Sequence, residues 1–149
     1  FCDAYAQLLS IILSNGEIVF YDINFTKLIS KAKLNLIDNE EITSVVSKEN
    51  GKKYIFGTST GRVFIGTILY KTSYSDELDR ITEPKITFSE SYQISDSPVQ
   101  HIDFISTDEV QTFVAIDLRQ RLRVLKLASS NEEDDLFSSH QVIKYNLQS

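Results

Sequence analysis

Histidine is the most frequent general base of enzymes and cysteine is a strong nucleophile, and this chain contains few of either. Its histidines are His101 and His140, each in a strand-like run, and its single cysteine is Cys2. Nucleophilic catalysis needs a nucleophile held against a base, and no known motif joins these three residues. We therefore expect surface or sheet histidines, and we predict that the chain is not an enzyme.

Carboxylates are more numerous, but they fall in two polar runs, residues 76–79 and 132–135. Carboxylates that act as acid and base need surroundings that separate their pKa values, whereas a solvated run gives every member the same surroundings. Neither run has the spacing and the glycine of an EF-hand calcium loop. Both are predicted to be solvated loops, and we expect no bound metal and no other cofactor.

Three glycines follow one another closely at Gly57, Gly61 and Gly66. A phosphate-binding loop would end in Gly-Lys-Ser or Gly-Lys-Thr and lead into a helix, and this segment does neither. We expect Gly61 in a turn. Gly57 and Gly66 are expected at bulges or where the backbone is closely approached.

Arginines alternate along one predicted strand at Arg119, Arg121 and Arg123. Alternate residues of a strand share a face, so the three side chains are expected to form one stripe that an anionic partner could contact. The alternative is a solvated face, or ion pairs with the nearby acidic loop, because most surface ion pairs carry no function.

Three similar segments position these residues: Leu8–Ile23, Lys53–Ile68 and Thr112–Leu127. Each consists of a β-type run, a short polar turn and a second β-type run. Both faces of the second runs are partly apolar, which is typical of strands covered on both sides. The repetition predicts three β-hairpins.

The first two turns contain Asn15-Gly16 and Thr60-Gly61. Glycine is favoured there because tight hairpin turns need residues with positive φ. The third turn has Arg119-Gln120 at this place, so we expect it to be formed less favourably or to be longer.

Further strand-like runs flank the hairpins, and they complete a meander of three or four strands in each unit. These runs are Lys27–Leu36, Ile42–Val46, Lys85–Ile94, Val99–Ile105 and Gln141–Leu147. The polar segment Thr72–Glu83 is predicted to be a surface loop with room for one helical turn.

The interval from the first hairpin to the second matches one propeller blade, about 40–45 residues. We therefore predict a single all-β, β-propeller-like domain over residues 1–149, with three consecutive β-meander blades at about 5–37, 42–96 and 98–148. Closed propellers have four to eight blades, so three leave two apolar faces open. Further blades in a longer protein, a second copy, or a different β architecture would cover them. The first is favoured, since the chain opens with Phe1 and not with methionine.

The net charge of −6 argues against binding to nucleic acid or to anionic lipid. No stretch approaches the roughly 20 apolar residues that span a bilayer. We expect any membrane attachment to lie outside this segment.

The second unit and the start of the third resemble the extracytoplasmic insert of enlarged permease subunits of bacterial phosphate-specific ABC transporters. The matching positions are Gly57, Thr58, Gly61, Val63, Gly66, Ile68, Tyr70, Thr72, Ser97, Pro98 and Val99. The resemblance implies a degenerate WD40-like propeller segment on the periplasmic side. It implies a non-catalytic accessory domain that contacts transporter subunits, the phosphate-binding protein or a second copy of itself. No phosphate-binding residue is carried over, because a separate protein captures phosphate.

A eukaryotic scaffold propeller, of the nucleoporin or vesicle-coat type, is the alternative. Such propellers share the lone turn glycines, the acidic loops and the lack of a Trp-Asp signature. The chain contains no tryptophan, so that signature is absent under either interpretation.

Overall fold

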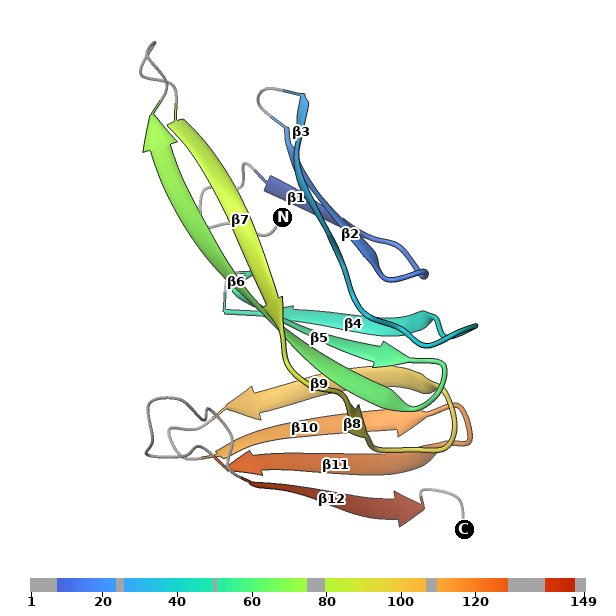
Figure 1. The fold of residues 1–149 in the computed structure, drawn as a ribbon. Helices are drawn as coiled ribbons and strands as arrows, with labels where there is room; N and C mark the ends of the chain where they lie inside the picture. The colour runs from blue at the N-terminus through green and yellow to red at the C-terminus, as the bar shows by residue number, and fades with distance from the viewer. Residues whose placement is uncertain are drawn as a thin grey trace.

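The computed structural model describes residues 8–23, 26–49, 51–74, 80–106, 110–128 and 139–146. Within these ranges the chain forms twelve β-strands and no helix. The strands make three antiparallel sheets that follow one another along the chain and stack face to face (Figure 1). The described residues thus contain no helix that could span a membrane.

Each sheet is a meander in which consecutive strands are neighbours, with the exception of the short β8. The first sheet contains β1 (Leu8–Ile12), β2 (Glu17–Asp22) and β3 (Lys27–Lys33). The second contains β4 (Ile42–Lys48), β5 (Lys53–Thr58), β6 (Arg62–Tyr74) and β7 (Arg80–Phe88), and the short β8 (Tyr92–Gln93) pairs with β6. The third contains β9 (Val99–Ser106), β10 (Val110–Asp117), β11 (Arg121–Ala128) and β12 (Ser139–Asn146).

The predicted all-β class and the three meander units are confirmed by this arrangement. The three predicted hairpins correspond to β1-β2, β5-β6 and β10-β11. Alternation explains the pattern of burial in β2, where Ile18, Phe20 and Asp22 are buried and the residues between them are half-buried.

The loop predicted over Thr72–Glu83 is wrong at both of its ends. β6 continues to Tyr74 and β7 already begins at Arg80, and Thr72 pairs with Thr82. Polar composition alone does not indicate a loop, because a two-stranded ribbon is held by hydrogen bonds between backbones and accepts polar side chains on its exposed faces. Residues 75–79 lie outside the described ranges.

Two apolar clusters hold the three sheets together. One lies between the first and second sheets and is centred on Leu8, Ile18, Phe20 and Phe56. The other lies between the second and third sheets and contains Ile55, Val63, Val99, Phe113, Leu125 and Leu127. Each pair of neighbouring sheets therefore packs through its own apolar core, as in stacked repeats.

The two terminal sheets each keep an apolar outer face in the part of the chain that the structure describes. On the first sheet this face carries Ile11 and Leu28, which are 43% and 45% exposed. On the third sheet it carries half-buried Val114 and Val124, with Ile105 68% exposed. The described sheets thus do not close on themselves.

Candidate interaction surface

Three hairpin turns and two linkers gather at one end of the stacked sheets, on the right in Figure 1. We name this end the turn edge: turns 13–16, 59–61 and 118–120, with linkers 34–41 and 94–98. Backbone hydrogen bonds tie these segments to one another, because Ile42 N–H donates to the Ser14 carbonyl at 2.8 Å and Leu118 N–H donates to the Pro98 carbonyl at 2.8 Å. These hydrogen bonds fix the loops relative to the sheets, as is common for loops that bind partners.

Each turn contains one residue with positive φ, at Gly16 (93°), Gly61 (82°) and Gln120 (62°). A Cβ at Gly61 would lie 2.0 Å from the carbonyl oxygen of Ser95, so only glycine fits there. The third turn has three residues between its strands, like the second. The third turn is therefore no longer than the second. Instead, Gln120 adopts the left-handed conformation, which is less favourable for glutamine than for glycine. Its N–H donates to the Asp117 carbonyl at 3.0 Å.

A buried polar cluster in the second sheet is centred on Glu40, whose side chain has no exposed surface. Its carboxylate accepts hydrogen bonds from the Thr58 hydroxyl at 2.7 Å and from Arg62 Nε at 2.9 Å. Arg62 Nη2 and the Thr60 hydroxyl donate to it as well. The Ile37 N–H completes the set at 3.1 Å. The two-pronged contact with Arg62 is the strongest form of such a pair.

The charges of this cluster are fixed at neutral pH. Burial raises the pKa of the Glu40 carboxyl, but the hydrogen bonds from Arg62, Thr60 and Thr58 and from the Ile37 N–H lower it more, to about 2. The bond to Glu40 in turn raises the pKa of Arg62. A catalytic acid or base would need a pKa near the working pH, so this arrangement is suited to holding structure.

A second polar cluster, in the third sheet, is centred on Asp117, which is 1% exposed. Its carboxylate accepts the N–H groups of Arg119 and Arg121 at 3.0 Å each, the Ser95 hydroxyl at 2.6 Å and Arg121 Nε at 2.8 Å. Arg121 Nη2 also pairs with Asp96. Burial raises the pKa of Asp117, yet the bonds from Ser95 and Arg121 lower it more.

The three arginines of the predicted stripe have different surroundings. Arg119 is exposed in the turn, Arg121 is engaged by Asp117 and Asp96, and Arg123 is 4% exposed on the side of β11 that faces the second sheet. Contact of all three with one anionic partner stays a prediction.

Glu40 and Asp117 were not singled out from the sequence. The available signal was the spacing of Thr58 from Arg62 and of Asp117 from Arg121, four residues across a turn in both cases. Such a spacing lets the end of one strand meet the start of the next.

The remaining glycines lie where the backbone is closely approached. A Cβ at Gly57 would lie 2.4 Å from Ser44 Oγ and 2.6 Å from Val99 Cγ1. Gly57 also faces the register shift between β4 and β5, which marks a bulge. A Cβ at Gly66 would lie 2.9 Å from Ile86 Cδ1. These two residues serve the packing of strands.

Most of the residues considered for chemistry lie apart or outside the described ranges. His101 is exposed on β9, and His140 belongs to β12. Cys2 and the runs 76–79 and 132–135 lie outside the described ranges. Among the described residues, no group of three or more His, Cys, Asp and Glu side chains could hold a metal ion.

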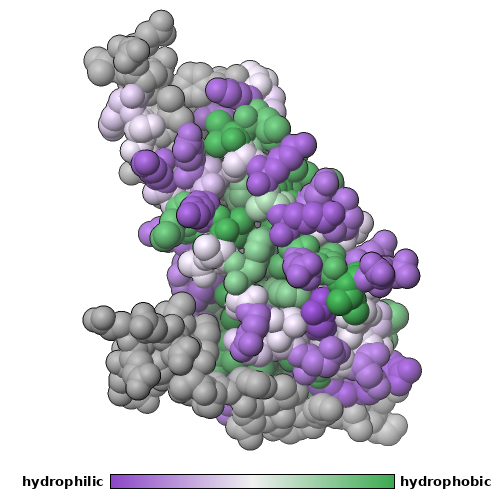
Figure 2. All heavy atoms as spheres, viewed as in Figure 1, coloured by the Kyte–Doolittle hydropathy of each residue, from purple (hydrophilic) through white to green (hydrophobic). Residues whose placement is uncertain are grey.

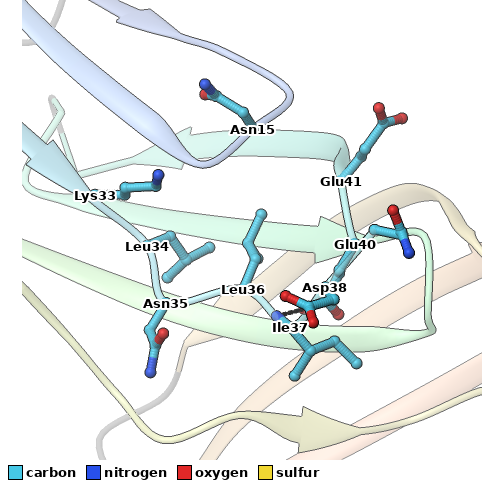
Figure 3. A pocket seen from close by; sticks show the side chains of 10 residues that line it. Asn15, Lys33, Leu34, Asn35, Leu36, Ile37, Asp38, Glu40 and Glu41 are labelled. Carbon is cyan, nitrogen blue, oxygen red and sulfur yellow. Dashed lines mark hydrogen bonds between the residues drawn. The ribbon is translucent and has the colours of Figure 1, made fainter.

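A groove of about 570 Å³ lies on the turn edge, between the first hairpin turn and linker 34–41 (Figure 3). Leu36 and Ile37 form its apolar part, and Ile37 is 56% exposed. Asn15, Lys33, Asp38 and Glu41 surround this part with polar groups. Figure 2 shows an apolar patch at this edge with hydrophilic side chains around it.

Comparisons with known proteins give no protein-family model and no curated protein that matches this chain. Among solved structures, the chain is similar to the WD40 domain of SCAP from fission yeast, with a TM-score of 0.53 and 13% identity, over 95% of this chain and 32% of that chain. It therefore spans about a third of that chain's length.

Two further solved structures have lower TM-scores. A chain of the Mitotic Checkpoint Complex has a TM-score of 0.45 and 10% identity, over 89% of this chain and 34% of that one. The β-propeller domain of Myceliophteria thermophila Cps50 (Swd1) has 0.45 and 9%, over 97% of this chain and 57% of that one. The likeness to the SCAP WD40 domain, at 13% identity, shows the fold alone: this chain forms three consecutive blades of a WD40-like β-propeller.

Proposed function

We propose that this chain is a non-catalytic module for protein–protein contact, and that a partner protein binds its turn edge. The observation that carries the proposal is the contrast between the two kinds of side chain found there. The charged groups Glu40 and Asp117 are used in buried ion pairs. Leu13, Ile37 and Leu118 instead present aliphatic side chains that are 41%, 56% and 58% exposed. Exposed apolar side chains on rigid loops are suited to a protein interface.

The setting that we propose is the extracytoplasmic side of a phosphate transporter permease, where the module would contact transporter subunits or the phosphate-binding protein. Its support is the motif of the second sheet, from Gly57 to Thr72, together with Ser97-Pro98-Val99. A scaffold role in a large intracellular assembly is the alternative. Protease treatment of spheroplasts that express the full-length protein separates the two: cleavage from outside supports the permease setting, and full protection contradicts it.

The interaction itself is tested by placing a photoreactive p-benzoylphenylalanine at chosen positions in the protein, in cells of its source. Positions 37 and 118 lie on the turn edge, and position 52, in the exposed turn at the opposite ends of β4 and β5, is the control. We expect one discrete cross-linked partner from positions 37 and 118. Cross-links from position 52 alone would overturn the assignment of the turn edge.

A further inference from the structure

We propose that the groove beside linker 34–41 binds an extended peptide segment of a partner protein in which an apolar residue is followed closely by Lys or Arg. This inference rests on the proposed function and names the partner's chemistry at one place on the turn edge. The apolar side chain would lie on Leu36 and Ile37, and the cation would lie at Asp38 and Glu41.

The shape of the linker is fixed in advance by the buried cluster beneath it. Residues 37–40 form a tight turn in which Glu40 N–H donates to the Ile37 carbonyl at 3.1 Å and Asn39 has a φ of 62°. The buried Glu40 carboxylate accepts the Ile37 N–H on the other side of this turn. Glu41 N–H donates to Ser59 Oγ at 2.9 Å. Little conformational entropy is therefore lost when a ligand binds, which favours affinity.

The charges of the groove determine which ligand it suits. Asp38 and Glu41 are exposed, and no ion pair joins either of them to another residue that the structure describes. Figure 3 shows Lys33 and Glu41 at opposite ends of the groove. With a net charge of −6, the chain also attracts basic segments and repels acidic ones. A cation at the Glu41 end is the complementary partner.

The polar lining indicates a peptide and not a compact apolar ligand. Asn15, Asn35 and Asn39 line the groove, and each side-chain amide both donates and accepts hydrogen bonds. Such groups can pair with the N–H and carbonyl groups of an extended backbone. The volume of about 570 Å³ falls in the range of ligand sites and accommodates a few residues.

A library of random twelve-residue peptides displayed on phage is the probe, with the 149-residue chain as bait. The consensus of the enriched peptides is synthesised and titrated against variants by fluorescence anisotropy. We expect an apolar residue beside Lys or Arg in this consensus. Ile37→Ser should weaken its binding by about tenfold, as loss of a buried apolar contact does. Glu41→Gln should weaken it by about threefold, and binding should fall as salt rises.

Matched controls lie elsewhere on the surface. Ile105→Ser removes an apolar side chain from β9 that is 68% exposed, against 56% for Ile37, and Glu83→Gln removes an exposed carboxylate from β7. Both should leave peptide binding unchanged, and thermal unfolding should show that all four variants remain folded.

Three results would overturn the inference: no enrichment, a consensus without a basic residue, or binding that is insensitive to both Ile37→Ser and Glu41→Gln. Failure of this inference can be distinguished from failure of the proposed function. If peptides bind and Leu118→Ser abolishes their binding while the groove variants do not, the turn edge remains an interaction surface and only the groove is excluded. The cross-linking experiment tests the turn edge independently of the library.

Discussion

The second and third sheets stabilise equivalent hairpins with the same three chemical groups. The segments that supply the carboxylate and the hydroxyl are interchanged between the two sheets. In both, an arginine begins the third strand of the meander, Arg62 in β6 and Arg121 in β11. In the second sheet the linker supplies the buried carboxylate, and the end of β5 supplies the hydroxyl of Thr58. In the third sheet the end of β10 supplies the carboxylate, and the linker supplies the hydroxyl of Ser95.

The first sheet has no arginine at this position, so the sheet itself does not depend on one. Glu17 begins β2, and its N–H is capped by the Asn15 side chain at 3.0 Å. In the other two sheets a carboxylate, a hydroxyl and a guanidinium are in contact, although different segments supply the carboxylate and the hydroxyl. The two carboxylates hold different segments. Glu40 accepts the Ile37 N–H and so holds linker 34–41, which lines the groove, whereas Asp117 accepts the Arg119 N–H and holds its own hairpin turn.

The largest expected effect comes from Glu40→Gln, which leaves Arg62 without its carboxylate in a largely buried place. We expect the free energy of unfolding to fall by about 3 kcal/mol, as for other broken buried pairs. Urea denaturation at pH 7 measures it. Glu41→Gln, at the exposed neighbouring position, is the control and should change the value by less than about 0.5 kcal/mol. Equal effects of the two variants would contradict the assignment of Glu40 as the buried partner.

The pH dependence of stability should separate the wild type from Glu40→Gln. A carboxyl whose pKa is lowered by folding stabilises the protein above its ordinary pKa of 4.5, and this contribution is lost as the pH falls toward about 2. The wild type should therefore lose stability over that range. The variant should show a flatter profile, with a remainder from Asp117, whose pKa is also lowered. Superimposable profiles, measured by thermal unfolding at a series of pH values, would count against the low pKa of Glu40.

A double substitution tests the exchange of positions directly. Glu40→Ser with Thr58→Asp rebuilds in the second sheet the arrangement of the third. We expect Thr58→Asp to destabilise the wild type, because two carboxylates would meet, but to restore about 1–2 kcal/mol in the Glu40→Ser background. The sign change in a double-mutant cycle is the readout. If Thr58→Asp destabilises both backgrounds equally, the two positions are not interchangeable.

The smallest effect concerns the turns. Gln120→Gly should stabilise the chain by about 0.5–1 kcal/mol, because glycine adopts the φ of 62° without the steric cost borne by other residues. Differential scanning calorimetry would show a higher midpoint. Arg119→Gly, one residue earlier in the same turn, is the control and should not raise it. A lower midpoint for Gln120→Gly would mean that the glutamine side chain itself stabilises the turn.

The sequence was sufficient for the hairpins but not for the polar clusters. Asn15-Gly16 and Thr60-Gly61 are local signals, and the turns formed where they predicted. Glu40 and Glu41 are adjacent and chemically identical, and nothing local indicates that one is buried and the other exposed. That difference depends on Arg62, which is 22 residues away in the sequence and lies beside the linker only in the folded sheet.

The predicted loop at Thr72–Glu83 failed for a related reason. Its polar composition is compatible with solvent, and so is a ribbon in which Thr72 pairs with Thr82. Polar composition indicates that side chains are exposed to solvent. It does not indicate whether the backbone pairs with a neighbouring strand. The arginine stripe shows the same limit, because alternation predicted a shared face but not that Arg123 would be covered by the second sheet.

Local sequence patterns were enough to predict the β class, the three meander units and their turns, because these follow from a periodicity of two and from residues that tolerate positive φ. The tertiary structure alone decided which carboxylates are buried, which strand ends meet which linkers, and where the groove lies. Those properties depend on contacts between segments that are separated along the chain, such as Glu40 with Arg62 and Ser95 with Asp117, and these contacts exist only in the folded chain.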